Sequence, residues 1–249
     1  MPQLTGVRPM SSLRLRPPRL WPPRPGQPLL AAGHRTAVAV TIGAGALITV
    51  VLGVATAHQT HAGPVDRAID HWLASTLSQH LVLLDGWADC GAPFEVTVTA
   101  AVVFVACLCA RWLRGALLMA AAVTAGGLAE YTLKPLFGRT LYGYLSYPSG
   151  HTIGAFTLAV TFAVLLTGPR HPPLPGAARW VLTAVALLAA CGVAVAQVAR
   201  DKHYFTDTVG GAALSIATVL LLALVIDALA SRLSTLLAEP KTSTGKRFH

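Results

Sequence analysis

The chain of 249 residues is 54% hydrophobic and only 12% charged, and its mean hydropathy is positive. This balance excludes an ordinary soluble globular domain and indicates a protein of the lipid bilayer. The formal net charge of +9 would suit a nucleic-acid-binding protein, but the positions of the basic residues favour a membrane topology instead.

The N-terminal part of the chain differs from everything that follows. Residues 1–35 combine proline and arginine without an apolar period, which predicts a disordered cytoplasmic tail. A cleaved signal peptide is the alternative, because VATAHQ after the first apolar run resembles a cleavage site. Both the tail and the apolar run are too long for a signal peptide, so we favour the tail.

Six apolar runs are long enough to cross the hydrocarbon core of a bilayer. They lie near residues 37–57, 92–110, 115–133, 152–168, 179–199 and 208–230. We therefore predict an all-α fold, an integral membrane bundle of six transmembrane helices. The membrane domain is expected over residues 36–232, and a basic cytoplasmic tail over residues 233–249.

The segment between the first two spans is not a span itself. Residues 64–89 place apolar residues at mixed helical spacing among charged ones, which predicts an amphipathic helical segment on the outer surface. The four cysteines suggest neither a disulfide framework nor a metal cluster, and three of them fall inside spans. We expect no metal and no cofactor.

The basic residues indicate which side of the membrane each loop faces. With the N-terminus in the cytoplasm, 14 of the 19 basic residues fall on the cytoplasmic side of the six spans, as does the C-terminus. The exceptions are Arg67, Lys134, Arg139, Arg200 and Lys202. All of these except Arg67 lie in two short loops, and such clustering indicates a functional cause.

The two loops open on the same face of the membrane, because the chain crosses twice between them. Together they hold an ionisable group of six residues: Lys134, Arg139, His151, Arg200, His203 and Asp207. Three basic side chains and two histidines in one region repel one another unless an anion lies among them. Arginine and lysine donors suit a phosphate, and the positive-inside assignment makes this face extracytoplasmic.

The stretch YPSGHTIGAF, residues 147–156, leads into the fourth span. Ser149 and Gly150 precede the helix, so its first unpaired N–H groups and its dipole point into the loop. Gly150 also lets the backbone approach a ligand closely. The pattern predicts that His151 stands at a helix N-terminus where a phosphate rests.

The second histidine adds chemistry. In HYFTD, His203 and Asp207 are four residues apart, which puts them on one face of a helix. The carboxylate can then hold one imidazole nitrogen and leave the other free to attack. A capping role for His151 and an interfacial pair for His203 and Asp207 are the alternatives, but the shared face and the basic cluster favour a functional site.

These residues resemble the three ordered motifs of the type 2 phosphatidic acid phosphatase family of membrane lipid phosphatases. The motifs are Lys134 with Phe137 and Arg139, then Pro148-Ser149-Gly150-His151, then His203 with Asp207 and the following Gly210-Gly211. The likeness covers residues from about 60 to 230. It implies a six-helix membrane fold and metal-independent hydrolysis of a phosphate ester.

The resemblance also implies roles for individual residues. His203 would be the nucleophile that forms a phosphohistidine, Asp207 its orienting partner, and His151 the acid that protonates the leaving oxygen. The phosphoryl oxygens would be bound by Lys134, Arg139, Ser149, Gly150 and Arg200.

Two positions depart from the family pattern. Leu141-Tyr142 stands where the first motif usually has Arg-Pro, and Ala196-Gln197 stands where the third motif usually has Ser-Arg. We expect Arg139 and Arg200, which lie nearby in the sequence, to replace the usual arginine pair together.

The sequence therefore predicts a multi-pass cell-membrane phosphatase that hydrolyses a lipid or isoprenoid phosphate or diphosphate at the extracytoplasmic face. Its partners are that substrate and the membrane lipid, not nucleic acid. A non-catalytic protein that binds or transports a lipid phosphate is the alternative, and phosphotransfer to an acceptor other than water would use the same site. The sequence leaves open phosphatidate, phosphatidylglycerol phosphate and polyprenyl phosphates as substrates.

Overall fold

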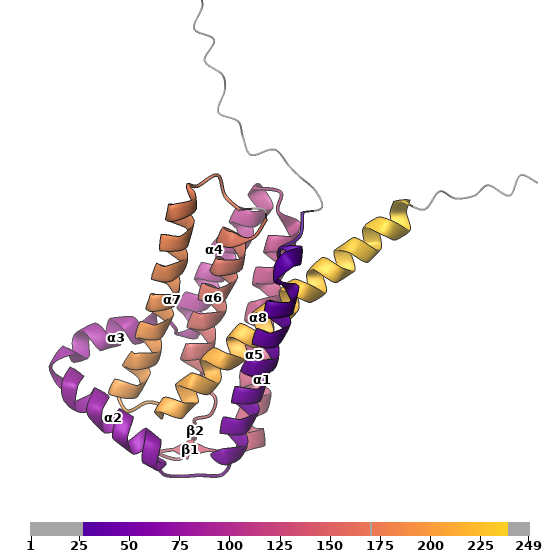
Figure 1. Ribbon diagram of the computed structural model, residues 1–249. Helices are drawn as coiled ribbons and strands as arrows, with labels where there is room; N and C mark the ends of the chain where they lie inside the picture. Colours follow the sequence, from indigo (N-terminus) through magenta and orange to yellow (C-terminus); the bar gives the residue numbers. More distant parts are fainter. Residues whose placement is uncertain (1–26, 170, 239–249) are drawn as a thin grey trace, which may run out of the picture.

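The computed structural model describes residues 27–169 and 171–238, and six long helices in it coincide with the predicted spans (Figure 1). They are α1 (Arg35–Ala55), α4 (Pro93–Cys109), α5 (Leu113–Phe137), α6 (Gly150–Thr167), α7 (Gly176–Ala199) and α8 (Phe205–Ala238). An apolar chain in a bilayer must satisfy its backbone polar groups internally, which helices do. The predicted all-α membrane bundle is confirmed.

The number of membrane crossings follows from helix length. Five of the six helices are long and apolar enough to cross a membrane alone. The helix α4 has only 17 residues, and it passes the same test only together with residues 64–89, from which it is bent by 46°. The chain is a multi-pass membrane protein with five spans, or six if this bent pair counts as one.

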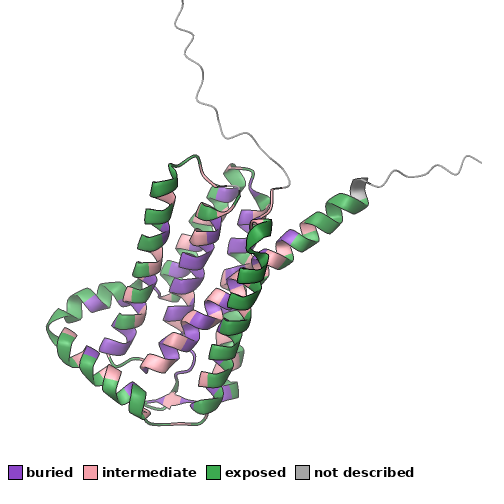
Figure 2. Cartoon of the chain, in the orientation of Figure 1, coloured by how far each residue is buried: buried purple, intermediate pink, exposed green. Residues whose placement is uncertain are grey.

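The helix α6 lies at the centre of the bundle. It contacts α4, α5, α7 and α8. In its most apolar stretch 61% of the residues are buried, against 22–39% in the other single-helix spans (Figure 2). The surrounding helices instead expose large apolar side chains such as Val50, Val102 and Leu188. The first residues of α6 are therefore enclosed by other helices, whereas the outer helix faces suit lipid.

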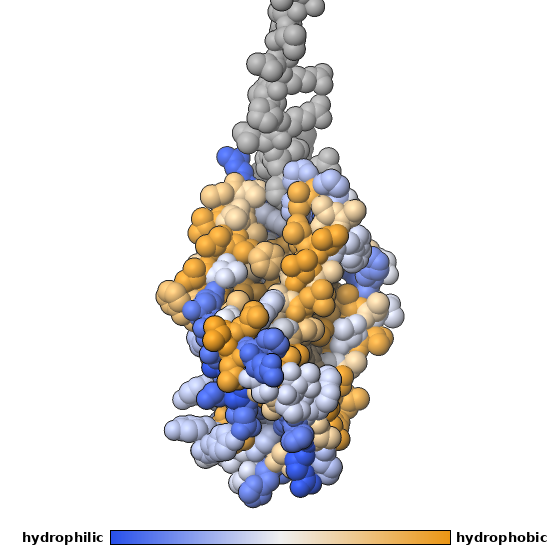
Figure 3. Space-filling model, turned by 90° about the vertical axis from the view of Figure 1, so that its left-hand side faces the viewer, coloured by the Kyte–Doolittle hydropathy of each residue, from blue (hydrophilic) through white to orange (hydrophobic). Residues whose placement is uncertain are grey.

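The amphipathic segment predicted for residues 64–89 is helical. It consists of α2 (Pro64–Leu77), the 3-10 turn η2 (Ser78–His80) and α3 (Leu81–Asp89). Both helices pack against α7, and α2 also reaches α8. Figure 3 views the side of the molecule that carries this arm, and its hydrophilic residues gather toward the lower end of the bundle.

A short antiparallel hairpin joins α5 to α6 at that lower end (Figure 1). Its strands are β1 (Thr140–Leu141) and β2 (Tyr144–Leu145), with Thr140 opposite Leu145. The helix α5 stops just before the hairpin at Gly138, whose φ of 59° is a left-handed cap that glycine adopts without strain. We call this part of the bundle the hairpin end.

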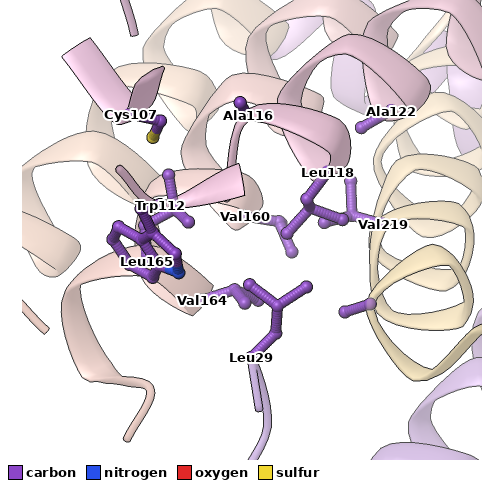
Figure 4. Packing of buried hydrophobic residues seen from close by; sticks show 11 residues of the cluster. Leu29, Cys107, Trp112, Ala116, Leu118, Ala122, Val160, Val164, Leu165 and Val219 are labelled. Atoms are coloured by element: carbon purple, nitrogen blue, oxygen red, sulfur yellow. The ribbon is translucent and has the colours of Figure 1, made fainter. Parts of the chain in front are cut away.

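The chain before α1 is packed against the opposite end of the bundle. Leu29 is only 1% exposed and belongs to the apolar cluster shown in Figure 4. The Asp227 carboxylate accepts the N–H groups of Leu29 and Leu30 at 2.8 and 3.0 Å. It also accepts a bond from Arg114 at 3.0 Å. A buried carboxylate needs such partners, so they fix this segment in place.

The structure describes a part of each predicted tail. Residues 27–35 lead into α1, and the contacts of Leu29 and Leu30 with Asp227 hold this part of the predicted disordered tail against the bundle. Residues 1–26 lie outside the described part of the chain. At the other terminus, residues 233–238 continue α8, and residues 239–249 again lie outside the described part.

The two loops with clustered basic residues meet at the hairpin end. Tyr144 in β2 and Lys202 between α7 and α8 line one cavity there. Pro173 lies in the connection between α6 and α7, at the opposite end. The side of the membrane that the hairpin end faces stays a prediction, and Arg170, one of the residues assigned to the cytoplasm, is outside the described residues.

Cysteine labelling tests this arrangement. In a variant without the four native cysteines, Tyr144→Cys and Lys202→Cys should react in intact cells with a thiol reagent that does not cross membranes. Pro173→Cys should react only after the cells are opened, because it lies at the other end of the spans. Labelling of Tyr144→Cys and Lys202→Cys from opposite sides would contradict the fold, and protection of both in intact cells would reverse the predicted orientation.

Candidate active site

Residues from three parts of the sequence line a cavity of about 230 Å³ at the hairpin end. Lys134 comes from the last turn of α5, Gly150 and His151 from the first turn of α6, and His203 from the connection between α7 and α8. The remaining lining residues are Pro93, Glu130, Leu141, Tyr144, Leu145, Ser146 and Lys202. The structure thus brings together four of the predicted site residues.

Asp207 lies behind His203. Its carboxylate is fully buried, and Oδ2 is 3.6 Å from Nδ1 of His203. This separation is slightly longer than a hydrogen bond. Nδ1 has no hydrogen-bond partner among the described residues, so a small approach of the two side chains would pair them. In this orientation Nε2 is the nitrogen left for a ligand in the cavity.

The Asp207 carboxylate is held by two further donors. Nη1 of Arg139 lies 2.5 Å from Oδ1, and the N–H of Tyr204 donates to Oδ2 at 3.2 Å. The backbone connects the same residue to α6, because the N–H of Ser149 donates to the carbonyl oxygen of Asp207 at 3.1 Å. The two predicted halves of the site, on α6 and α8, are therefore joined directly.

A carboxylate and an ammonium group lie together at the N-terminus of α6. Nζ of Lys134 is 2.7 Å from Oε1 of Glu130, one helical turn earlier in α5. A Cβ atom on Gly150 would overlap the Glu130 carboxylate, which would then have to move away from the helix N-terminus. Glu130 therefore occupies the side of the helix N-terminus where the sequence predicts a phosphate.

Three of the predicted phosphate ligands do not line the cavity. Arg139 is fully buried behind Asp207, where two carboxylates hold its guanidinium group. Ser149 is also fully buried, and its hydroxyl accepts a hydrogen bond from Thr152 at 3.1 Å. Nε of Arg200 lies 2.5 Å from Oδ1 of Asp85 in α3.

In this structure neither Arg139 nor Arg200 lies in the cavity, although the sequence predicts that together they replace the arginine pair of the family. Each guanidinium group is drawn away from the cavity by a carboxylate of the α2–α3 segment, Asp66 in one case and Asp85 in the other. Leu141, at the usual arginine position of the first motif, lines the cavity without a charge. Gln197 stands at the usual arginine position of the third motif and is buried. Its carbonyl oxygen accepts hydrogen bonds from the N–H groups of Lys202 and His203.

Three residues with functional positions were missed by the sequence reasoning. Glu130 is a charged residue in an apolar run, which is a signal that the sequence does contain. Ser146 is buried in the cavity wall, and its hydroxyl has no partner among the described residues. Asp66 gave no signal, because its contact with Arg139 spans 73 residues.

No group of three or more histidine, cysteine, aspartate or glutamate side chains within residues 27–169 and 171–238 is arranged to hold a metal ion. Metal independence stays a prediction, which hydrolysis in the presence of a chelator tests.

Comparisons with known proteins agree with this architecture. A family model described as the PAP2 superfamily matches residues 115–230, which include every predicted site residue. The fold is similar to the crystal structure of a transmembrane PAP2-type phosphatidylglycerolphosphate phosphatase from Bacillus subtilis, with a TM-score of 0.62 and 19% sequence identity. That match covers 77% of this chain and 96% of the other. A comparison with curated proteins gives no match. Residues 115–230 thus match the PAP2 superfamily, in agreement with the resemblance to the type 2 phosphatidic acid phosphatase family that the sequence motifs indicate.

Proposed function

We propose that the protein is a membrane phosphatase that hydrolyses a phosphorylated lipid at the extracytoplasmic face through a phosphohistidine on His203. The observation that carries the proposal is the cavity at the hairpin end. His151 reaches it from α6 and His203 from the connection between α7 and α8, Asp207 lies behind His203, and Lys134 and a helix N-terminus supply positive charge. The match of residues 115–230 to the PAP2 superfamily supports the same reaction class.

The first half of the reaction transfers the phosphoryl group to the protein. Nε2 of His203 attacks phosphorus while the bond from phosphorus to the lipid oxygen breaks. His151 donates a proton to that oxygen, so that the lipid leaves as an alcohol. Asp207 stabilises the positive charge that develops on the imidazole ring.

The second half returns the protein to its starting state. A water molecule attacks the phosphorus of the phosphohistidine, and the bond from phosphorus to nitrogen breaks. His151, now neutral, takes a proton from this water. Inorganic phosphate leaves, and the charge on its oxygens is balanced throughout by Lys134, the first amides of α6 and the Ser146 hydroxyl.

The position of the cavity favours a lipid substrate. It lies at the ends of membrane-spanning helices, and Gly150, Pro93 and Glu130 also border an apolar groove of about 380 Å³ between α4, α5 and α6. A hydrocarbon chain can therefore lie in the bilayer while its phosphate enters the cavity. The related Bacillus subtilis structure makes phosphatidylglycerol phosphate the first substrate to test.

A non-catalytic lipid-phosphate binder remains a second candidate, because the cavity lining contains no arginine among the described residues. Phosphate release decides between the two. Purified protein in a chelator should release phosphate from at least one of phosphatidate, phosphatidylglycerol phosphate, a polyprenyl phosphate or a polyprenyl diphosphate. Binding of these lipids without release from any of them would favour the binder.

Replacement of the nucleophile is the next test. His203→Ala should lower kcat at least about 1,000-fold, because the proposed mechanism uses no other nucleophile. The control His61→Ala removes an exposed histidine near the same end of the bundle and should leave kcat unchanged. A folded His203→Ala protein with turnover near wild type would exclude the phosphohistidine mechanism.

Arg200 and Lys134 should behave differently. Arg200→Ala should change kcat/KM less than about threefold, because it removes only a partly exposed ion pair with Asp85. Lys134→Ala should lower kcat/KM about 100- to 1,000-fold by removing a donor to the developing charge. The reverse order of the two losses would mean that Arg200 turns into the cavity when substrate binds.

Glu130 should compete with the phosphate for the N-terminus of α6. We expect Glu130→Gln to bind inorganic phosphate about three- to tenfold more tightly in calorimetric titrations, because a like charge is removed and Lys134 is released. Glu95→Gln, which neutralises an exposed carboxylate in the first turn of α4, is the matched control. Weaker binding by Glu130→Gln than by this control would instead mean that Glu130 helps to hold the ligand.

A further inference from the structure

Arg139 is held between two carboxylates from distant parts of the chain. Its side chain is fully buried, and Nη2 lies 2.5 Å from Oδ2 of Asp66 in α2. Nη1 lies 2.5 Å from Oδ1 of Asp207 in α8. The planar guanidinium group, with donors on both sides, suits this arrangement better than an ammonium group would. We call it the Asp66–Arg139–Asp207 bridge.

Neighbouring groups fix the bridge from several directions. The N–H of Thr206 donates to Oδ1 of Asp66 at 2.9 Å, and its hydroxyl lies 3.1 Å from Oδ2 of the same carboxylate. Nη1 of Arg139 also donates to the Thr206 hydroxyl at 2.7 Å. The guanidinium carbon lies 4.1 Å from the centre of the Tyr204 ring. All of these contacts surround the first turn of α8, which follows His203 directly.

We propose that Asp66 and Arg139 are positioning residues, which hold the Asp207 carboxylate behind His203 and set the charge that the imidazole ring experiences. This inference rests on the proposed function of His203. It gives Arg139 a role behind the nucleophile, in place of the phosphate contact expected from the family pattern.

The charge balance explains why the second carboxylate is needed. Arg139 alone would cancel the charge of Asp207, and a neutral pair stabilises a positive imidazole ring weakly. With Asp66 included, two carboxylates face one guanidinium group and the bridge keeps a net negative charge. Asp207 is thereby held rigidly by Arg139 while the negative charge beside His203 is retained.

Other charged and titratable groups also face His203 or the bridge. Across the cavity these are Glu130, Lys134, His151 and Lys202. Around the bridge they are Asp70, Tyr147, Asp201 and Tyr204. Burial, partly opposed by the N–H of Phe205, raises the pKa of Asp70 to about 7. Asp70 therefore carries less negative charge near neutral pH than an ordinary aspartate does.

The test follows the titration of His203 by NMR in detergent-solubilised protein with ¹⁵N-labelled histidine, with His203→Ala to assign the signal. Asp66→Asn should move the titration midpoint to lower pH by about 0.5–1 unit, because a negative charge is lost nearby. Asp66→Asn combined with Arg139→Gln also removes the positive charge beside Asp207, so its midpoint should lie at higher pH than that of Asp66→Asn alone. Asp70→Asn is the matched control and should move the midpoint less than Asp66→Asn, because Asp70 does not contact Arg139 and carries less charge near neutral pH.

In each variant, the acid limb of the profile of kcat/KM against pH should move in the same direction as the midpoint of the His203 titration. If the proposed function is wrong, the wild-type protein releases no phosphate, but the NMR midpoints still decide the inference. An unmoved midpoint in a folded Asp66→Asn protein would overturn it, as would an equal shift in Asp70→Asn.

Arg139→Lys provides a second test, which can be used if the Asp66 variants do not fold. It keeps the charge but cannot span both carboxylates, so the midpoint should stay at the wild-type value. In the active enzyme kcat should fall about tenfold while KM changes less than twofold, because Asp207 is held less firmly. Thermal unfolding of each variant identifies losses that come from stability alone. A shifted midpoint in folded Arg139→Lys, or an unchanged kcat, would contradict the positioning role.

Discussion

The buried ion pairs of Arg139 are the interaction on which the hairpin end depends. They connect the residue that opens the hairpin to α2 on one side and to the first turn of α8 on the other. Removing one member would leave a charge buried without compensation, at a cost of about 3–5 kcal/mol. The outer segment, the hairpin and the start of α8 are therefore ordered together, and His203 lies at their junction.

Much of this architecture follows from local patterns in the sequence. The apolar runs predict the six long helices, and counting the crossings predicts that His151 and His203 meet at one end. The direction of each basic side chain does not follow in the same way. Arg139 and Lys134 are close in sequence, yet Arg139 turns to Asp66 because α2 folds back against α8, a tertiary contact that no local pattern encodes. Arg200 turns to Asp85 because α3 packs against the end of α7, which is also a tertiary contact.

The departures from the family pattern thus have a consistent physical meaning. Where the family usually has arginine, Leu141 and Gln197 bring no charge to the cavity, and positive charge comes from Lys134, Lys202 and the α6 N-terminus. Glu130 partly neutralises this charge, since it pairs with Lys134. A phosphate entering the cavity replaces one anion by another, which limits the charge repulsion among the basic groups.

Trapping of the covalent intermediate tests the central claim most directly. Protein mixed with a ³²P-labelled lipid phosphate and quenched in base within milliseconds should carry label that is stable in base and released by acid, as a phosphohistidine is. After proteolysis the label should lie on the peptide that contains His203, and His203→Ala should acquire none. Rapid phosphate release without any labelled protein, or a label on a peptide lacking His203, would contradict the account.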